Sequence, residues 1–495
     1  MKIIFLYFVL LSSCASCASR GLLSNLQCSV LLNYESNSDS STACIFSGVF
    51  GNTSITFNII PTFEGLPIDL DSFEILEFVD SWVSRIPPNL LQTFKNTEIL
   101  IMKNVSLGSV TDLDAGVRLR ELFLSHNHIK NIGEMAFYCN KELNYVDLSH
   151  NEIQNLKLHT FLYTKKMKYL DLSHNRLKSI PNAFFYLKKL EYLDISYNLL
   201  MALYSTDFYG MHDVVTLKIE ENLIKEVSPT TFTSMPKLTS LSLRNNSIFD
   251  IILNFTNPRI FAVDLSLNFL WELEILQSVR KIDASHNKLS SLILGKNISI
   301  HELNLSYNLF KETTSVRQLS SLKRLYMAGN QLTHINHRSF YSLTDLVELN
   351  LADNLLKHLD LGALQHMTLL NHISIADNDV SFIRIPLNET VLKDLETIDV
   401  TRNSFSCNYL VKLMHDLNER GWRLVSREVD PVSNFLNIPC YNENDLQACR
   451  REMDELQVNF AEQITKLEEQ IGALYARIEN EATRVAGRPF YRKGK

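Results

Sequence analysis

The sequence predicts an α/β solenoid: a horseshoe of stacked coils with a parallel β-sheet on its concave side, followed by a C-terminal α-helical coiled coil. Two observations support this prediction. An asparagine recurs at intervals of 19 to 25 residues, and a heptad pattern of apolar residues begins where that recurrence stops. The recurring asparagines are Asn127, Asn151, Asn175, Asn198, Asn222, Asn246, Asn268, Asn287, Asn308, Asn330, Asn354, Asn378 and Asn403.

Each asparagine closes an LxLxxN-like frame, as in VDLSHNEI (146–153) and LNLSYNLF (303–310). This frame, with a period of about 20 to 29 residues, is the signature of leucine-rich repeats. The alternating leucines of a short strand point into the coil, and the residues between them face solvent. Because a coil buries its leucines only against its neighbours, the coils stack into a solenoid. The asparagine is expected to turn inward, where its amide both donates to and accepts from turn backbone.

A phenylalanine follows six of these asparagines by nine or ten residues and is expected to fill the convex side of the coil. The shorter repeats that end at Asn268, Asn287 and Asn308 lack it, which predicts a thinner convex wall there. Weaker coils are expected to extend the stack N-terminally, through residues 97–104 and 73–82. The phenylalanines are Phe137, Phe161, Phe184, Phe208, Phe232 and Phe340.

The N-terminus has the pattern of a secretory signal peptide, with one lysine, an apolar run and then small residues. Cleavage is expected near Ala18 or Ser19, and no other apolar stretch approaches the length of a membrane span. N-x-S/T sequons suit an extracellular glycoprotein, although Asn104 also reads as an inward-facing ladder residue. The other glycosylation candidates are Asn52, Asn245, Asn254, Asn297, Asn304 and Asn388.

Six cysteines lie outside the signal peptide, and an exported chain is expected to form disulfides. Solenoids need closed ends, and the pairs Cys28–Cys44 and Cys407–Cys440 fit the two cap positions. Six cysteines allow about 15 pairings, so the connectivity stays open. Cys139 is left as a half-buried free thiol or an intermolecular link.

These features divide the chain into six regions. Residues 1–19 form the signal peptide, 20–72 the N-terminal cap with the first irregular strands, and 73–403 the leucine-rich repeats. Residues 404–442 form the C-terminal cap, 443–485 the coiled coil and 486–495 a basic tail.

The coiled coil is predicted from apolar residues spaced by three and four, with one stutter at Phe460–Ile464. A stripe this narrow needs a partner helix; the alternative is a helix folded back onto the solenoid. Cys449 lies in the seam, so a parallel dimer would bring two copies together for an interchain disulfide. The rival is a local Cys440–Cys449 bridge. The other seam residues are Leu446, Met453, Leu456, Phe460, Ile464, Leu467, Ile471, Leu474 and Ile478.

The residues between the strand leucines form the candidate binding face. Two columns stand out: an aspartate-rich column within the frame, and a histidine-rich column just before the asparagine. Stacked histidines beside aspartates can chelate metal or sense pH. Zinc sites, however, usually have three or four protein ligands that point to one ion. We therefore predict no metal and no cofactor. The candidates are Phe123, His126, Asp147, His150, Asp171, His174, Asp194, Tyr197, Lys218 and Tyr326.

Several function classes have no support. The formal charge of −7 over 495 residues gives no reason to propose nucleic acid or membrane binding. The chain has no Gly-rich phosphate loop, HExxH motif or nucleophile elbow. The prediction is a non-enzymatic binding protein without catalytic residues.

The conjunction of a signal peptide, 23- to 24-residue repeats, cap cysteines and the seam at 446–478 resembles the mosquito leucine-rich-repeat immune proteins. In that family, disulfide-linked pairs circulate in haemolymph and stabilise a complement-like thioester protein against pathogens. The resemblance implies that Cys449, or else Cys440 or Cys407, links two chains, and that the coil selects the partner and helps to hold the effector.

Two other functions compete with this one. In the first, the protein is a secreted ligand or decoy for a cell-surface receptor, and the concave face dominates binding. In the second, it is a matrix scaffold whose coil makes homo-oligomers for avidity.

Overall fold

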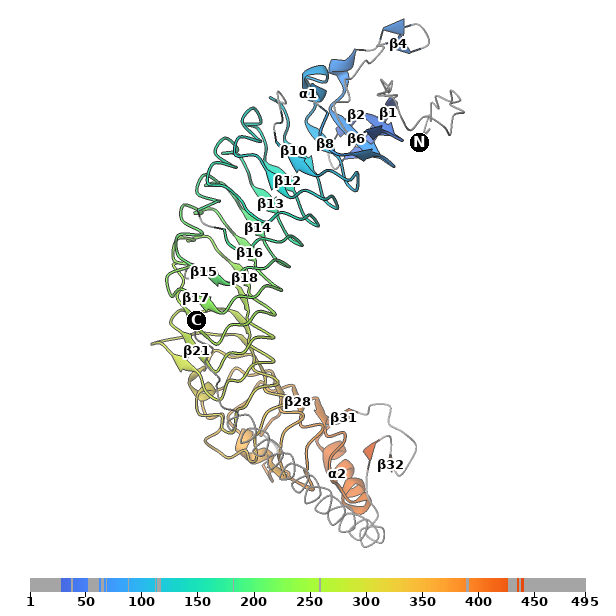
Figure 1. Cartoon of the computed structure of the whole chain (residues 1–495). Helices are drawn as coiled ribbons and strands as arrows, with labels where there is room; N and C mark the ends of the chain where they lie inside the picture. The colour runs from blue at the N-terminus through green and yellow to red at the C-terminus, as the bar shows by residue number, and fades with distance from the viewer. Residues whose placement is uncertain are drawn as a thin grey trace, which may run out of the picture.

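The computed structural model describes residues 28–36, 39–51, 62–63, 66–67, 69–87, 89–111, 113, 117–180, 182–257, 260–388, 391–425, 434–435 and 438–439. The described chain is a curved solenoid, with the N-terminal strands at one end and helix α2 (Cys407–Glu419) at the other (Figure 1). The predicted signal peptide, coiled coil and basic tail lie outside the described residues.

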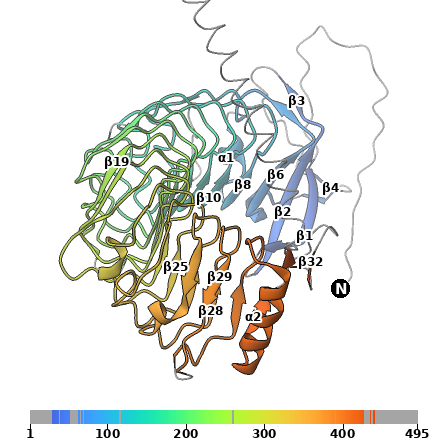
Figure 2. The ribbon, with the colours of Figure 1, turned by 90° about the horizontal axis from the view of Figure 1, so that it is seen from below.

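The concave side is one 18-stranded sheet (Figure 2). Each strand pairs with the strands of the neighbouring coils, and every pairing is parallel except the β1–β2 hairpin. The strands are β1 (Cys28–Ser36), β2 (Asp39–Ser47), β6 (Ile75–Val79), β8 (Ile99–Ile101), β10 (Glu121–Phe123), β12 (Tyr145–Asp147), β13 (Tyr169–Asp171), β14 (Tyr192–Asp194), β16 (Thr216–Lys218), β18 (Ser240–Ser242), β20 (Ala262–Asp264), β22 (Lys281–Asp283), β24 (Glu302–Asn304), β25 (Arg324–Tyr326), β26 (Glu348–Asn350), β28 (His372–Ser374), β30 (Thr397–Asp399) and β31 (Arg423–Val425).

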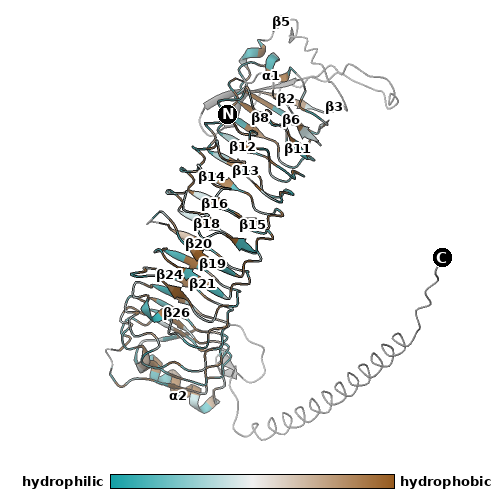
Figure 3. Ribbon diagram, turned by 60° about the vertical axis from the view of Figure 1, so that its left-hand side comes forward, coloured by the Kyte–Doolittle hydropathy of each residue, from teal (hydrophilic) through white to brown (hydrophobic). Residues whose placement is uncertain are grey.

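The predicted solenoid with a parallel sheet is confirmed. Strands β6 and β8 lie inside the two weaker N-terminal coils, so those coils are confirmed as well. The repeating strands are short because the chain must leave the sheet and turn around the coil after each LxL segment. Figure 3 shows them side by side along the long axis of the molecule.

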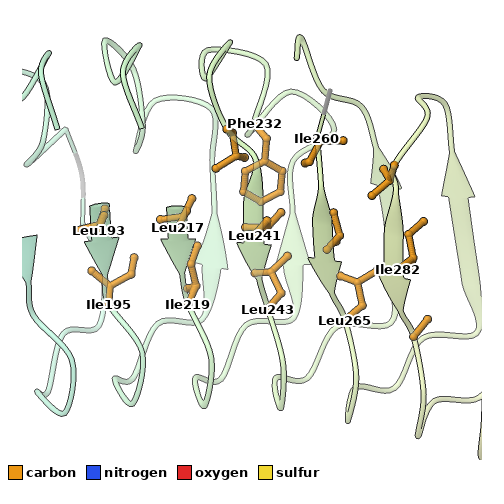
Figure 4. Packing of buried hydrophobic residues seen from close by; sticks show 14 of the residues in the cluster. Leu193, Ile195, Leu217, Ile219, Phe232, Leu241, Leu243, Ile260, Leu265 and Ile282 are labelled. Atoms are coloured by element: carbon orange, nitrogen blue, oxygen red, sulfur yellow. The ribbon is translucent and has the colours of Figure 1, made fainter. Parts of the chain in front are cut away.

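The core is a double column of apolar side chains, one pair from each coil. Leu193 and Ile195 from one coil pack beside Leu217 and Ile219 from the next (Figure 4), and all four are fully buried. Because neighbouring coils provide most of this contact, removing one coil would expose the leucines of two others.

The asparagines form a buried ladder, as predicted. The side-chain oxygen of Asn175 accepts from the backbone N–H of Ile153 at 2.9 Å. Its amide group donates to the carbonyls of Leu148 (2.9 Å) and Leu172 (3.0 Å). Each asparagine therefore joins its own coil to the preceding one through the polar groups of the turn backbone.

The prediction that Asn104 belongs to this ladder is wrong. Asn104 is exposed with a positive φ of 53°, and the buried ladder position in its coil is held by Val105. The backbone N–H groups of Val105 and Leu107 donate to Asn127 of the next coil, both at 3.0 Å. The apolar frame of this coil therefore ends one residue later than its asparagine suggests.

The convex side combines turns, short strands and buried phenylalanines. The predicted phenylalanines are buried, and those from Phe137 to Phe232 form a row. The prediction that the repeat ending at Asn268 lacks this phenylalanine is wrong, because Phe255 fills the position there, 6.0 Å from Phe232. The shorter repeats also carry extended segments, which form a three-stranded sheet of β19 (Asp250–Leu253), β21 (Glu272–Ile275) and β23 (Ile293–Leu294). Two-stranded pairs on the outer wall are β9 (Ser109–Val110) with β11 (Asn131–Ile132), β15 (Ala202–Leu203) with β17 (Glu226–Val227), and β27 (His358–Asp360) with β29 (Phe382–Arg384).

Helix α2 closes the C-terminal end. Ser406 caps it by accepting from the N–H of Tyr409, and Leu410, Leu413 and Leu417 form its buried stripe, as the three-and-four spacing requires. The remaining short elements are β3 (Phe50–Gly51), β4 (Thr62–Phe63), β5 (Leu66–Pro67), β7 (Trp82–Val83), β32 (Asn434–Phe435), β33 (Ile438–Pro439), α1 (Leu90–Thr93), η1 (Leu70–Ser72), η2 (Val316–Gln318) and η3 (Leu361–Leu364).

Cys44 and Cys407 are each disulfide-bonded, and Cys139 is a free, partly exposed thiol. The side chains of Cys28, Cys440 and Cys449 are not among those described, so the cap pairings and the interchain bond stay predictions. Within the described residues, no helix has both the length and the apolar character of a membrane span.

Candidate binding surface

The concave sheet brings the predicted aspartate-rich column into register. Phe123 pairs with Asp147, and the pairing continues strand by strand through Asp171 and Asp194 to Lys218. The same column then runs along the rest of the sheet through Ser242, Asp264, Asp283, Asn304, Tyr326, Asn350, Ser374 and Asp399.

A tyrosine column that the sequence reasoning missed runs beside the aspartates. Tyr145 stacks on Tyr169 with ring centroids 4.2 Å apart, and Tyr169 stacks on Tyr192 at 4.4 Å. Burial, followed by neighbouring ionisable groups, raises the pKa of all three phenols well above the usual range. The alternation of side chains along a strand could have revealed this column. Each tyrosine lies two residues before an aspartate, so both side chains point to the same face of the sheet.

Two of the three aspartates beside these tyrosines have lysine partners. Asp147 lies 4.0 Å from Lys103, and Asp194 lies 3.7 Å from Lys218. The central Asp171 accepts a 2.8 Å bond from the N–H of Ser173. Burial raises the pKa of Asp171, while its hydrogen bonds with Ser173 oppose that shift and the neighbouring carboxylates reinforce it.

The same two lysines also contact aromatic rings. The ammonium of Lys103 lies 4.6 Å from the ring centroid of Phe123, and that of Lys218 lies 5.5 Å from the ring of Tyr192. Each lysine therefore fixes one end of the tyrosine and aspartate columns by charge and by cation–π contact.

The histidine column forms a continuous ring stack. His126, His150 and His174 stack at 4.1 and 4.0 Å, and Tyr197 continues the stack at 4.0 Å. All four residues have a positive φ between 52° and 57°. Burial and the two flanking histidines lower the pKa of His150, and Asp147 partly opposes the shift.

The stack does not converge on one point as metal ligands do. Within the described chain, one group of three potential ligand residues has its ligand atoms within 4.8 Å of one another: His415, Asp416 and Glu419 on α2. Those residues are exposed or half-buried and lie far along the chain from the histidine stack, so the geometry gives the stacked rings no chelating role.

The C-terminal half of the face is a charge ladder. Glu302 pairs with Lys281 at 2.7 Å and with Arg324 at 3.2 Å, and Arg324 also lies 3.6 Å from Glu348. The hydroxyl of Tyr326 donates to Glu348 at 3.0 Å. Burial and this carboxylate raise the pKa of Tyr326 to about 12.

Small side chains separate the two halves. Ser240, Ser242 and Ala262 leave a shallow hollow between Lys218 and Asp283. The concave face therefore has an aromatic and acidic N-terminal half, a hollowed middle and an ion-paired C-terminal half. Such an arrangement is suited to polar recognition of another molecule, because its hydroxyl, carboxylate and ammonium groups line an open concave face rather than an enclosed apolar cavity.

The sequons fall on different sides of the solenoid. Asn304 lies in concave strand β24, where its amide donates to Asp283 at 3.1 Å and its oxygen accepts from the N–H of Ser306 at 3.0 Å. Asn245 is exposed and follows the left-handed φ pattern, and its amide donates to Glu221. Asn297 and Asn388 are exposed, Asn254 is half-buried directly after convex strand β19, and Asn52 lies outside the described residues.

Comparison with known proteins agrees with this geometry. The family model for the leucine rich repeat matches residues 117–177, 141–200, 202–248 and 320–380. The chain folds as a leucine-rich-repeat solenoid. A curated relative, Toll-like receptor 3 of Boselaphus tragocamelus, is 30% identical over 146 residues, which are 28% of this chain and 15% of the receptor.

Solved structures share the fold of this solenoid. The crystal structure of the LRIM1/APL1C complex has a TM-score of 0.54 at 19% identity, covering 90% of this chain and 77% of that chain. The APL1 leucine-rich repeat domain gives 0.52 at 18% identity, covering 81% of this chain and 98% of that domain. Toll in the Drosophila Toll–Spätzle complex gives 0.56 at 18% identity, covering 79% of this chain and 56% of that one.

Proposed function

We propose that the protein is a secreted, non-enzymatic binding protein of innate immunity. In this proposal it pairs with another leucine-rich-repeat chain through residues 443–485 and Cys449, and the pair stabilises or presents a complement-like thioester protein against pathogens. The observation that supports pairing most is the likeness to the LRIM1/APL1C complex, which extends over 90% of this chain. The predicted heptad seam supports the same role, because its narrow apolar stripe needs a second helix.

The concave face supplies the binding part of the proposal. Its tyrosine and aspartate columns present hydroxyl and carboxylate groups in a fixed strand register. A preformed polar surface of this kind favours recognition of another protein, since few groups must be reordered on binding.

The test of pairing is electrophoresis of the secreted full-length chain with and without reductant. We expect a band of roughly twice the mass, lost on reduction and absent in Cys449→Ser. The matched control is Cys139→Ser, which removes a thiol that the structure shows to be free and should leave the band unchanged. A monomer in every lane would contradict the interchain bond. Capture of a thioester protein from haemolymph by wild type, but not by Cys449→Ser, would support the effector role.

A receptor ligand or decoy is the second candidate. The observation that favours it is the likeness to Toll, whose solved structure is a complex with Spätzle, together with the lysine-capped columns of the concave face. In that case Phe123→Ser, Lys218→Glu or Tyr326→Ser would abolish capture of the partner, whereas seam substitutions would not.

A further inference from the structure

One flank of the solenoid carries an exposed apolar patch. It consists of Leu199, Met201, Leu223, Phe249, Phe269 and Trp271, which lie one or three residues after four consecutive ladder asparagines. We call these six residues the flank patch. Phe249 and Phe269 stack at 6.0 Å, and the N–H of Trp271 bonds the carbonyl of Phe249 at 2.9 Å. Phe249, Phe269 and Trp271 therefore lie next to one another across two neighbouring coils.

The preceding coils use the same positions differently. There His128 and Arg176 both contact Glu152, at 3.1 and 3.2 Å, forming a row of polar contacts. The change to leucine, methionine, phenylalanine and tryptophan therefore replaces solvated charge with apolar surface. Trp271 is 58% exposed, and the patch exposes on the order of 500 Å² of apolar surface, a size at which such patches mark interaction sites.

The patch has charges of both signs at its borders, because Glu226, Asp250 and Glu272 directly follow its repeat positions. Lys225 lies within it, and Lys288, Lys311 and Lys357 follow along the same flank in later coils, all exposed. Within the described part of the chain these four lysines have no ion-pair partner, whereas Lys103, Lys166, Lys168, Lys218, Lys237 and Lys281 all have one. The occupant of the patch is thus expected to be amphipathic, with an apolar face and some acidic side chains opposite these lysines.

We infer that the flank patch is the docking surface for this chain's own C-terminal segment, residues 446–478. That segment has an apolar seam at helical spacing, and between Asp445 and Glu481 its acidic side chains outnumber the basic ones by nine to four. The apolar stripe of this segment is complementary to the apolar patch, and its acidic side chains can face Lys225 and Lys288, the second of which lies 5.1 Å from the ring of Phe269.

The length of the segment allows this docking within one chain. The described chain ends at strand β33, just after β32, which lies against α2 at the C-terminal end. The patch coils lie about 30 to 45 Å from that end, at roughly 4.8 Å per strand. A helix over residues 443–485 would be about 65 Å long, which is enough to reach them.

Docking and pairing exclude one another, because a single seam cannot face the patch and a partner helix together. The unpaired chain therefore covers its own seam, and a partner chain must displace the segment from the flank. Docking within one chain goes beyond the proposed pairing of two chains. It would remain possible if the electrophoresis experiment showed no interchain disulfide.

Trp271 reports on docking directly. All variants of the full-length chain would carry two substitutions: Trp82→Phe, which removes an exposed tryptophan, and Cys449→Ser, which prevents an interchain bond. The third tryptophan, Trp422, is buried and gives a constant fluorescence background. Acrylamide quenching of Trp271 is then compared with that of the seam variant Leu467→Asp/Leu474→Asp. The matched control, Thr465→Asp/Ala476→Asp, adds the same charge on the opposite helix face.

We expect quenching to rise at least about twofold in the seam variant and to be unchanged in the control, since a docked helix removes the ring from solvent. The patch variant Leu223→Ser/Phe269→Ser should behave like the seam variant, with circular dichroism confirming its fold. Equal quenching in all chains would overturn the inference. Protection that disappears on dilution would also overturn it, because the occupant would then be a second chain.

Discussion

The residue before each ladder asparagine adopts a left-handed backbone conformation, and in this chain it is almost never glycine. His150, Glu221 and Arg402 have φ values of 52°, 51° and 51°, and Gly329 is the exception, with φ of 65°. Such a conformation costs roughly 1 kcal/mol or more for a residue with a Cβ. The asparagine amide offsets this cost by bonding the turn backbone, so strained and stabilising residues stand next to each other in every coil.

The ladder leads to a first prediction, at Asn175. Replacing Asn175 with leucine leaves the N–H of Ile153 without its partner. It also removes one of two asparagine bonds from each of the carbonyls of Leu148 and Leu172. We expect a loss of about 2 to 4 kcal/mol of unfolding free energy, measured by urea denaturation. The exposed Lys178→Leu in the same coil is the control, and an equal loss there would contradict the role of the ladder.

His150 gives a pH prediction. Its pKa in the folded protein is lowered below 6.5, mainly by burial, so the unfolded chain binds the proton more tightly. Stability should therefore fall as the pH drops through about 6.5, because protonation then favours unfolding. His150→Gln should flatten the dependence of Tm on pH between about 7 and 5. The same substitution at the exposed His337, used as the control, should leave the dependence of Tm on pH unchanged.

Asn304 gives a prediction about modification. Both ends of its side-chain amide are hydrogen-bonded on the concave sheet, and a glycan there would break these bonds. Glycopeptide mapping of the secreted protein should find Asn297 occupied and Asn304 bare. Glycan on Asn304 would mean that strand β24 is accessible when the chain is modified.

At the scale of the element, the frame predicts strands better than the segments between them. The alternation of buried and exposed residues in the LxL segment predicted the aspartate column correctly. The same alternation would have revealed the column of Tyr145, Tyr169 and Tyr192, which occupy the same position in three successive repeats. Val105 could not be anticipated, since only the buried backbone of its coil shows which residue turns inward. The β19–β21–β23 sheet was likewise unpredictable, because its strands depend on three neighbouring coils pairing with one another.

The convex phenylalanines allow a paired test at this scale. Phe184 is fully buried and stacks on Phe161 at 6.5 Å, whereas its neighbour Phe185 is only partly buried. Phe184→Ala should cost about 3 to 5 kcal/mol because it leaves a cavity between coils. Phe185→Ala should cost clearly less in the same denaturation experiment. Equal costs would mean that the convex wall does not depend on the buried row.

At the scale of the whole molecule, stability is a sum of neighbouring coil contacts, and the ends decide where unfolding begins. Helix α2 covers the last coil with Leu410, Leu413 and Leu417. The recognition of the fold needed only the recurring frame, whereas the flank patch becomes visible only when residues from four coils are brought side by side.

Leu413→Asp should therefore destabilise the solenoid from one end. We expect hydrogen exchange to accelerate around β30 and β31 and to stay unchanged around β12 and β13, because each coil contacts only its neighbours. Uniform acceleration along the chain would show that the solenoid unfolds as one unit.

The strands of the long sheet run across the axis of the molecule, which gives the protein a distinctive mechanical character. A pull on the two ends of the solenoid would load the hydrogen bonds between coils in series, so the weakest contact between two neighbouring coils would break first. Under tension, the molecule would then lengthen as its coils separate and unfold one by one. If one end of the molecule bound a partner and the other a surface, the distance between the two could increase gradually under force while both stay bound.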